Sequence, residues 1–248
     1  MKIIMIGNLK GGVGKTTSTV NLAYSLAILG KKVLVIDEDP QSNTTSFFGT
    51  VNGNDKTIWD LLQNPKNIRS CIYRSKYKNI DIVKGDPHLA EEDVKDLNWL
   101  RIVSREVSDK YDFCLVDTRP AFGALTDSVL EGAHMLLTPA CMDKFCRDNL
   151  SLVEDHIDFW VRENDLLWRV FATKIDARRK SQRSTYLDLV GKHQYPFLET
   201  CIRSSAIVDN ALELYKPVGK HRSGSPAAID YMDLAREIMK ELNTEEEE

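Results

Sequence analysis

Residues 10–17 read Lys10-Gly11-Gly12-Val13-Gly14-Lys15-Thr16-Thr17, and they stand between an apolar run at residues 3–6 and a helix-like segment at residues 18–29. Glycines let the backbone N–H groups of such a loop turn inward around phosphate oxygens. In this pattern Lys15 supplies a charge to the β- and γ-phosphates, and Thr16 offers a hydroxyl group to Mg²⁺. The segment therefore predicts a phosphate-binding loop, with every residue from Gly11 to Thr17 in contact with nucleotide.

The loop departs from the usual pattern G-x-x-x-x-G-K-[ST], because Leu9 stands where that pattern requires glycine. A second lysine, Lys10, opens the loop instead. Lys10 is too far along the loop to contact the same phosphate group as Lys15, so it is free to act elsewhere. A plain surface turn is the alternative, but eight contiguous matching positions between a strand and a helix are hard to obtain by chance.

Residues 10–17 resemble the deviant Walker A loop of the ParA/MinD group of P-loop ATPases. In that group the early lysine reaches across a dimer interface to the nucleotide of the partner. The resemblance implies that Lys10 contacts ATP bound by a second subunit, so that ATP and Mg²⁺ join two chains in a face-to-face homodimer. It also implies that Lys10 and Lys15 take part in catalysis.

The composition indicates a single α/β domain. The chain has 248 residues, of which 42% are hydrophobic, and we expect residues 1–243 to form one ATPase domain followed by a disordered acidic tail at residues 244–248. A net charge of −4 excludes a uniformly basic nucleic-acid binder. Five cysteines without C-x-x-C spacing, and no signal-like or membrane-spanning run, predict a reduced, soluble, cytoplasmic protein.

Apolar runs without alternation predict strands that are buried on both faces. They lie at residues 3–6, 33–36, 80–83, 113–116, 135–137 and 170–172. Helices are expected at residues 18–29, 122–132, 148–163 and 182–192, and from Ser225-Pro226 to about residue 242. We therefore predict a doubly wound, mostly parallel sheet with helices on both faces. Residues 51–79 look like an irregular excursion from this sheet.

Two carboxylates follow the strand at residues 33–36, in the segment Asp37-Glu38-Asp39-Pro40-Gln41. Ligands bind at this edge of a doubly wound sheet. The segment resembles the D-x-D-P-Q element of the same family, which implies that Asp37 holds the water shell of Mg²⁺ and that Asp39 orients or deprotonates the attacking water. Turn and capping chemistry is the alternative for such a pair.

The run Phe113–Asp117 has the form of a Walker B strand, whose terminal carboxylate holds Mg²⁺ through water. Thr16, Asp37 and Asp117 are thus the predicted metal-site residues. The family usually continues with two prolines, but here Arg119 stands where the first proline would be.

Relatives of this loop act on DNA, on membranes or in electron transfer. A final helix that turns acidic argues against a membrane partner, and cysteines without a confirming pattern argue against a shared iron–sulfur cluster. Basic residues that could neutralise DNA phosphates without reading bases gather late in the chain. The candidate DNA contacts are Arg178, Arg179, Lys180, Arg183, Arg203, Lys216, Lys220 and Arg222. An ordinary solvated face is the alternative for these residues.

The resemblance thus implies a small ParA-type partition ATPase. Its ATP-bound dimer would bind DNA non-specifically on the nucleoid, and a ParB-like, centromere-binding partner would stimulate hydrolysis and release. No helix-turn-helix extension precedes the loop, which disfavours operator binding. The main alternative is an ATPase of the same group that positions a protein client without binding DNA.

Overall fold

A computed structural model of the chain describes residues 1–50 and 52–243. Among these residues, seven strands form one sheet in the order β3-β4-β2-β5-β1-β6-β7, and only β3 at the edge runs antiparallel to its neighbour. The strands are β1 Lys2–Ile6, β2 Val33–Asp37, β3 Ile72–Arg74, β4 Ile80–Val83, β5 Phe113–Asp117, β6 Met135–Cys141 and β7 Leu167–Thr173. Every residue of β2 and β5 is buried, as expected for parallel strands covered on both faces.

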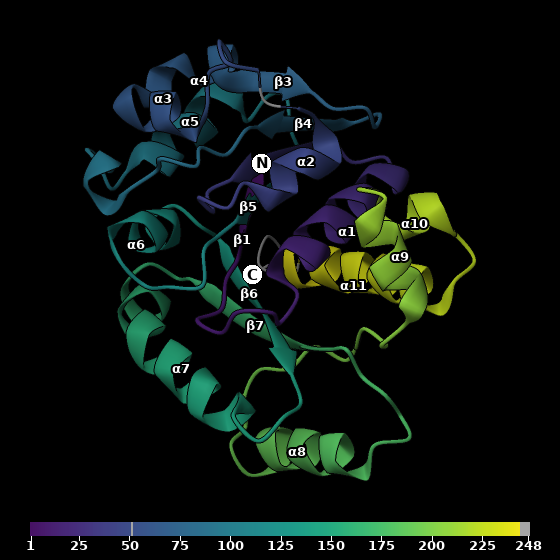
Figure 1. The fold of residues 1–248 in the computed structure, drawn as a ribbon. Helices are drawn as coiled ribbons and strands as arrows, with labels where there is room; N and C mark the ends of the chain where they lie inside the picture. Colours follow the sequence, from purple (N-terminus) through teal and green to yellow (C-terminus); the bar gives the residue numbers. More distant parts are fainter. Residues whose placement is uncertain (51, 244–248) are drawn as a thin grey trace.

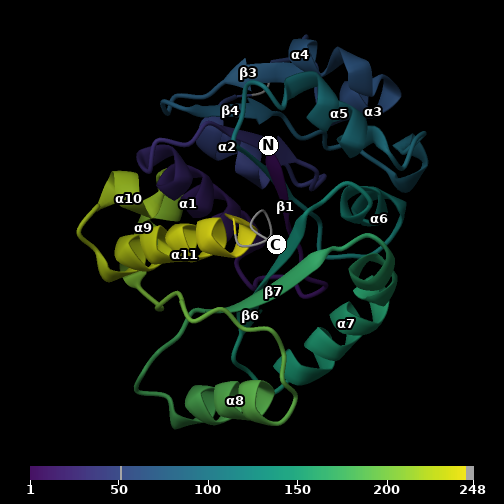
Figure 2. The same cartoon turned by 180° about the vertical axis from the view of Figure 1, so that it is seen from behind.

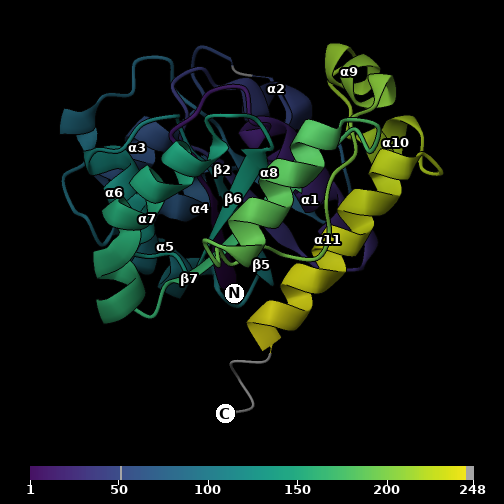
Figure 3. The same cartoon turned by 90° about the horizontal axis from the view of Figure 1, so that it is seen from below.

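Two helical layers cover the sheet, as Figure 3 shows. Side chains alternate across β1, so Ile3 and Met5 face one layer while Ile4 and Ile6 face the other. The first layer contains α3 Ile58–Gln63, α4 Ile68–Cys71, α5 Trp99–Val107, α6 Ala124–Leu130 and α7 Cys146–Glu163. The second contains α1 Lys15–Ile28, α2 Asn43–Phe48 and α11 Pro226–Asn243. The predicted doubly wound architecture is confirmed.

The remaining elements lie around these layers. They are the 3₁₀ helices η1 Pro65–Asn67 and η2 Glu91–Asp93, and the helices α8 Lys180–Gly191, α9 Ala206–Glu213 and α10 Val218–His221. In Figures 1 and 2, α8 lies at the β7 end of the molecule, far from β3, and α9 and α10 lie beside α1 and α11. Leu189 is the only buried residue of α8, so this helix contributes little to the core.

The strand register brings the carboxyl ends of three central strands to one edge. Ile6 of β1 and Asp37 of β2 are both aligned with Asp117 of β5. The loop at residues 7–14 continues from β1 at this edge and leads into α1. The sheet thus places the loop and the two carboxylates at the same level.

Most predicted elements are confirmed, but the interpretation of residues 51–79 as irregular is wrong. This region contains α3, η1, α4 and β3. Ile58, Leu61 and Leu62 are buried at helical spacing, and a capping box joins Thr57 and Asp60 at the start of α3. The region is compact because its short apolar runs pack on the sheet.

The predicted start of the last helix is confirmed, since the Ala228 N–H donates to Ser225 Oγ at 3.3 Å. Within the described ranges 1–50 and 52–243, no helix combines the length and the apolar character that crossing a bilayer requires. The expected acidic tail, residues 244–248, lies outside the described residues.

Candidate nucleotide-binding site

The loop between β1 and α1 adopts a conformation that depends on glycine. Gly12 and Gly14 have φ angles of 73° and 100°, where side chains are strongly disfavoured. Gly14 caps the start of α1, so Lys15 is the first helical residue. A Cβ atom added at Gly11 or Gly12 would meet no described atom within 4 Å. The loop therefore has open space beside Gly11 and Gly12, next to a helix start whose first N–H groups can bind an anion.

Lys15 points into the loop rather than to solvent. Its side chain donates to the carbonyl oxygens of Asn8 at 3.1 Å and Lys10 at 3.3 Å, and the residue is 7% exposed. Burial lowers the pKa of this ammonium group, while the nearby carboxylates of Asp117 and Asp39 oppose that shift. A buried cation aimed at loop carbonyls is poised to exchange them for phosphate oxygens.

Asp117 accepts hydrogen bonds from three threonine hydroxyls. The donors are Thr16 at 2.8 Å, Thr44 at 2.6 Å and Thr19 at 3.2 Å. Burial raises the pKa of Asp117 to about 6, although the hydrogen bonds from Thr44 and Thr16 favour the ionised form. The predicted metal-site residues Thr16 and Asp117 are therefore in direct contact.

Asp37 carries an unsatisfied oxygen. Its Oδ2 accepts from the Thr45 N–H at 2.7 Å and the Thr45 hydroxyl at 2.6 Å, whereas Oδ1 is buried without a hydrogen-bond partner. Burial, followed by repulsion from Asp117, raises the pKa of Asp37 to about 8. A divalent cation with its water shell would satisfy Oδ1 and remove the repulsion, so the donor set fits Mg²⁺.

This donor set is sparse. Over residues 1–50 and 52–243, no group of three or more His, Cys, Asp or Glu side chains is arranged to hold a metal. Mg²⁺ is commonly held by one or two carboxylates together with phosphate oxygens and water. Asp37 and Asp117 match that mode of binding.

Asp39 lies two residues beyond Asp37 and is half-buried. Its Oδ1 accepts the N–H of Gln41 at 2.9 Å, and its carbonyl accepts the N–H of Ser42 at 2.7 Å. These bonds fix the turn after β2 and hold the carboxylate on the side of Lys15, whose charge it influences. Asp39 is thus placed next to the phosphate loop, as the sequence predicts.

Lys10 lies on the rim of the loop, away from Lys15. Its ammonium group is ion-paired with Asp143, and 31% of its side chain is exposed. Asn8 holds the backbone here, because its Oδ1 accepts from the Lys10 N–H at 2.9 Å and from Asn149 at 2.7 Å. Sequence reasoning missed Asn8, Asp143 and Asn149, which carry no motif of their own.

A cavity of about 270 Å³ adjoins the loop on the other side. Val13 and Gly14 line it together with polar groups from the segment after β7, including Ser204, Ser205 and Asp209. No sequence pattern pointed to this segment as part of the site. Its position beside the helix start suits the nucleoside part of a nucleotide.

Two hydrogen bonds join β7 to the phosphate loop. The Thr173 hydroxyl donates to the Val13 carbonyl at 2.9 Å, and the Lys174 ammonium group donates to the Gly12 carbonyl at 2.8 Å. The loop is therefore attached to the strand that leads into α8.

The residue at the proline position of the family pattern, Arg119, forms an ion pair. Its guanidinium group is 2.6 Å from Glu91, and Glu91 also accepts the Leu125 N–H at 2.8 Å. Arg119 therefore links the turn after β5 to η2 and to the start of α6.

The candidate DNA contacts do not form one patch. Arg178 and Arg179 pair with Asp176, and Arg203 binds Asp230 through several hydrogen bonds. Lys180 and Arg183 lie on α8, whereas Lys216, Lys220 and Arg222 lie around α10. The two groups come from α8 at one end of the sheet and from the helices beside α1.

The sheet order, the glycine-dependent loop and the paired carboxylates at one edge define a P-loop nucleotide-binding fold. A family described as an AAA domain matches residues 1–166 of the chain. A chromosome-partitioning ATPase Soj of Treponema pallidum is 30% identical over 96% of this chain and 97% of its own. The chain belongs to the ParA/Soj family of partition ATPases.

A second relative agrees with this assignment, and a solved structure agrees with the fold. A virulence plasmid ParA family protein of Chlamydia psittaci is 29% identical over 99% of this chain and 97% of its own length. The ATP complex of a McdA variant from Cyanothece has a similar fold, with a TM-score of 0.83 and 21% identity over 97% of this chain and 96% of that chain.

Proposed function

We propose that this protein is an Mg²⁺-dependent ATPase whose ATP-bound homodimer binds DNA non-specifically and is released by hydrolysis. The observation that carries the ATPase part is the contact of Thr16 with Asp117 at the edge where Asp37 retains an unsatisfied oxygen. A phosphate loop beside two such carboxylates has the donors that a magnesium-bound triphosphate requires.

Each residue of the site has a role in this proposal. Lys15 and the backbone N–H groups of residues 11–17 bind and orient the phosphates, and Thr16, Asp37 and Asp117 hold Mg²⁺ and its waters. Bound Mg²⁺ would neutralise phosphate charge as the bond to the leaving group breaks. Asp39 orients the attacking water and accepts its proton. Positioning and charge neutralisation do most of the catalytic work in phosphoryl transfer.

Lys10 lies on the rim of the loop, where it can contact a second subunit. A lysine on the exposed side of the loop can leave Asp143 and contact the nucleotide of a second subunit. ATP then holds two chains together, and the dimer is the DNA-binding form. We propose that residues 1–243 form the single domain that does this.

The proposed DNA binding is supported by the family assignment and by the exposed basic residues. A ParB-like partner that stimulates hydrolysis is proposed from the same resemblance. Of the relatives at about 30% identity over nearly the whole chain, one is named a chromosome-partitioning ATPase and another a virulence plasmid ParA family protein. Exposed basic groups such as Lys180, Arg183 and Lys220 give affinity for phosphates without base readout.

Sedimentation and gel-shift assays with random-sequence duplex DNA test the proposal. We expect binding with ATP that weakens steeply with salt, and little binding with ADP or without nucleotide. Light scattering should show dimers with ATP and monomers with ADP. ATP-dependent dimers without DNA binding at low salt would instead support the client-positioning alternative, and the absence of ATP-dependent dimers would contradict both.

A further inference from the structure

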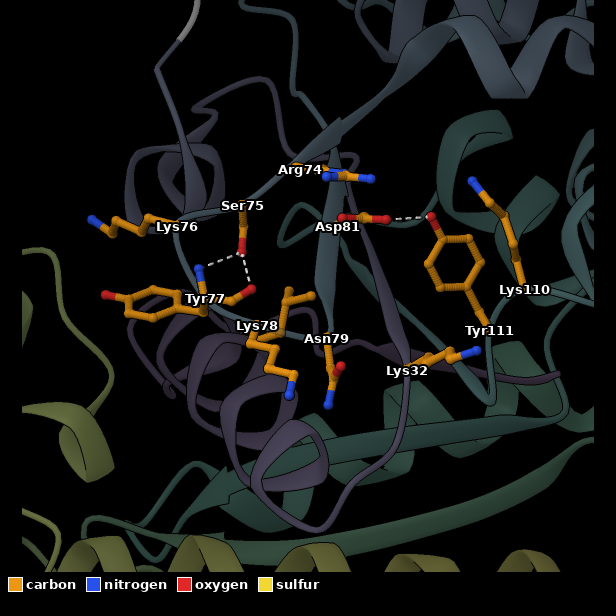
Figure 4. Close-up of a pocket in the computed structure, with 11 residues that line it drawn as sticks. Lys32, Arg74, Ser75, Lys76, Tyr77, Lys78, Asn79, Asp81, Lys110 and Tyr111 are labelled. Atoms are coloured by element: carbon orange, nitrogen blue, oxygen red, sulfur yellow. Dashed lines mark hydrogen bonds between the residues drawn. The ribbon is translucent and has the colours of Figure 1, made fainter.

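A basic cavity of about 460 Å³ lies at the edge of the sheet opposite to the phosphate loop (Figure 4). Lys32 and Lys110 precede β2 and β5, and Arg74 ends β3 beside them. The turn between β3 and β4 adds Lys76 and Lys78. The sequence scatters these residues over nearly eighty positions, so only the fold brings them together.

The positive charge of this cavity is largely uncompensated. Among the described residues, the side chains of Lys32, Arg74, Lys78 and Lys110 form no ion pair, although the Asp112 carboxylate accepts the backbone N–H of Lys32 at 2.7 Å. The acidic residue that lines the cavity is Asp81, and its Oδ2 already accepts the hydroxyl of Tyr111 at 2.7 Å. Clustered cations repel one another, which makes such a cluster costly without an anionic ligand. It occurs in a chain whose net charge is −4.

A second cavity of about 660 Å³ continues the first. The two share Lys76, Tyr77, Lys78 and Asn79, and the second adds Lys216 and Lys220 from the region of α10. We call the two cavities together the basic groove. Its cations are spread along the surface rather than gathered around one point, which suits an extended polyanion better than a single phosphate group.

The groove is held in shape by its turn. Ser75 Oγ accepts the Tyr77 N–H at 3.0 Å and donates to the Tyr77 carbonyl at 3.0 Å. Asn79 has a φ angle of 65°, a conformation that asparagine tolerates. The lysine side chains on this turn therefore project from a fixed backbone.

The aromatic rings of the groove are already engaged. Tyr77 packs edge-on against Tyr24 at 5.5 Å and against Phe48 at 6.1 Å, and Tyr111 is buried. Single-stranded nucleic acid is usually bound by stacking bases on free aromatic faces. Because these rings are packed against other side chains, they are not free to stack on bases. The backbone of duplex DNA is therefore the better ligand.

We propose that the basic groove binds the phosphate backbone of duplex DNA, with Lys32 and Lys78 among the contacts. This inference rests on the proposed function and joins two of the candidate DNA contacts, Lys216 and Lys220, to cations around the start of β2 that the sequence did not single out. The groove opens where β2 begins, whereas Asp37 of the nucleotide site ends β2. DNA in the groove therefore leaves the nucleotide site and Lys10 accessible to a second subunit.

The test uses a double variant, Lys32→Gln with Lys78→Gln, in the full chain. Lys66→Gln with Lys95→Gln is the matched control, because both residues are exposed, lie outside the groove and give the same change in charge. The measurement is the affinity for random-sequence duplex DNA with ATP between 50 and 200 mM salt. ATP-dependent dimer formation, measured by light scattering, shows that each variant is folded.

We expect the groove variant to bind DNA at least about tenfold more weakly at low salt. The slope of log affinity against log salt should become shallower by roughly 2, since each phosphate contact contributes about 0.9. The control pair should match the wild-type protein in affinity and slope.

Three results would overturn the inference in different ways. If wild-type protein binds DNA with ATP and the groove variant equals the control, the groove is refuted while the proposed function stands. If wild-type protein forms ATP-dependent dimers that bind no DNA, the DNA function and the groove fail together. If wild-type protein binds polyglutamate but not DNA, and the groove variant does not bind polyglutamate, the groove belongs to an acidic polypeptide instead.

Discussion

The ammonium group of Lys10 is ion-paired with the carboxylate of Asp143 from the same chain, 133 positions away in sequence. Lys10 is the residue that we propose to contact the nucleotide of a second subunit. It cannot hold Asp143 and a distant phosphate at the same time. In the proposed dimer, binding of the partner's nucleotide would therefore compete with an interaction inside the monomer.

Removing this competition should favour the dimer. Asp143→Asn abolishes the ion pair but retains the oxygen that accepts the Phe145 N–H at 3.0 Å. Each of the two chains gives up one such pair, and a partly exposed ion pair contributes up to about 1 kcal/mol, so we expect the dissociation constant of the ATP-bound dimer to fall by up to about 30-fold. Sedimentation equilibrium with ATP measures it. The control is Asp148→Asn, which removes an exposed ion pair with Arg147. Equal dimerisation of the two variants would contradict the competition.

Asp39 is proposed to act on the attacking water and not on nucleotide binding. Asp39→Ala should therefore keep ATP-dependent dimers while turnover falls by at least about 100-fold, the usual contribution of general-base catalysis. Phosphate release measures turnover, and light scattering measures the dimer. Hydrolysis at the wild-type rate would remove Asp39 from its assigned role.

The pKa of Asp37 gives the free protein a distinctive pH dependence. Burial raises this pKa to about 8, above the value of roughly 4 expected in the unfolded chain. Between these values the unfolded state binds fewer protons than the folded state, so the free energy of unfolding falls as pH rises from about 4 to about 8. Urea unfolding with EDTA and without nucleotide measures this decline. Asp37→Asn, which cannot ionise, should make the decline shallower, and the remainder comes from the buried carboxyl groups of Asp117 and Glu38, whose pKa values burial also raises. An unchanged slope would contradict the assignment.

Arg203 was predicted from sequence to contact DNA, but the structure gives it a structural partner. Its guanidinium group binds Asp230, whose side chain is only 10% exposed. Arg203→Ala should lower the free energy of unfolding by about 2 kcal/mol, because it leaves a nearly buried carboxylate without its charged donor. Urea unfolding compares it with Arg236→Ala, which removes an exposed pair with Asp233 and should cost under about 1 kcal/mol. Equal losses would contradict the structural role.

The fold was predictable where one local pattern determined the structure. The strand at residues 113–116 is apolar at every position, and Gly30 ends α1 with a φ angle of 86°. The region of residues 51–79 was misread because its helices are only four to six residues long. Such helices are stabilised by packing on the sheet rather than by their own sequence.

The candidate site likewise contains residues that the sequence could predict and residues that it could not. Lys15, Thr16 and Asp117 belong to contiguous motifs, so the sequence could single them out as candidates, and the structure brings Thr16 and Asp117 into contact. Asp143 and the groove residues before β5, such as Lys32, Lys78 and Lys110, were missed, because their relevance depends on contacts between distant segments, whereas Lys216 and Lys220 were already candidate DNA contacts. Lys32 and Lys78, for example, belong to no common sequence motif, so their proximity is visible only in the folded chain.

The hydrogen bond from Lys174 to the Gly12 carbonyl ties the segment after β7 to the middle of the phosphate loop. A shift of the loop backbone on nucleotide exchange would either strain this hydrogen bond or carry the segment after β7 with it. The next residues along the chain, up to Arg183, carry one group of exposed cations. An environment-sensitive dye at an exposed position such as Ala177 would thus register ATP arrival directly, giving a real-time signal of the switch without any partner added.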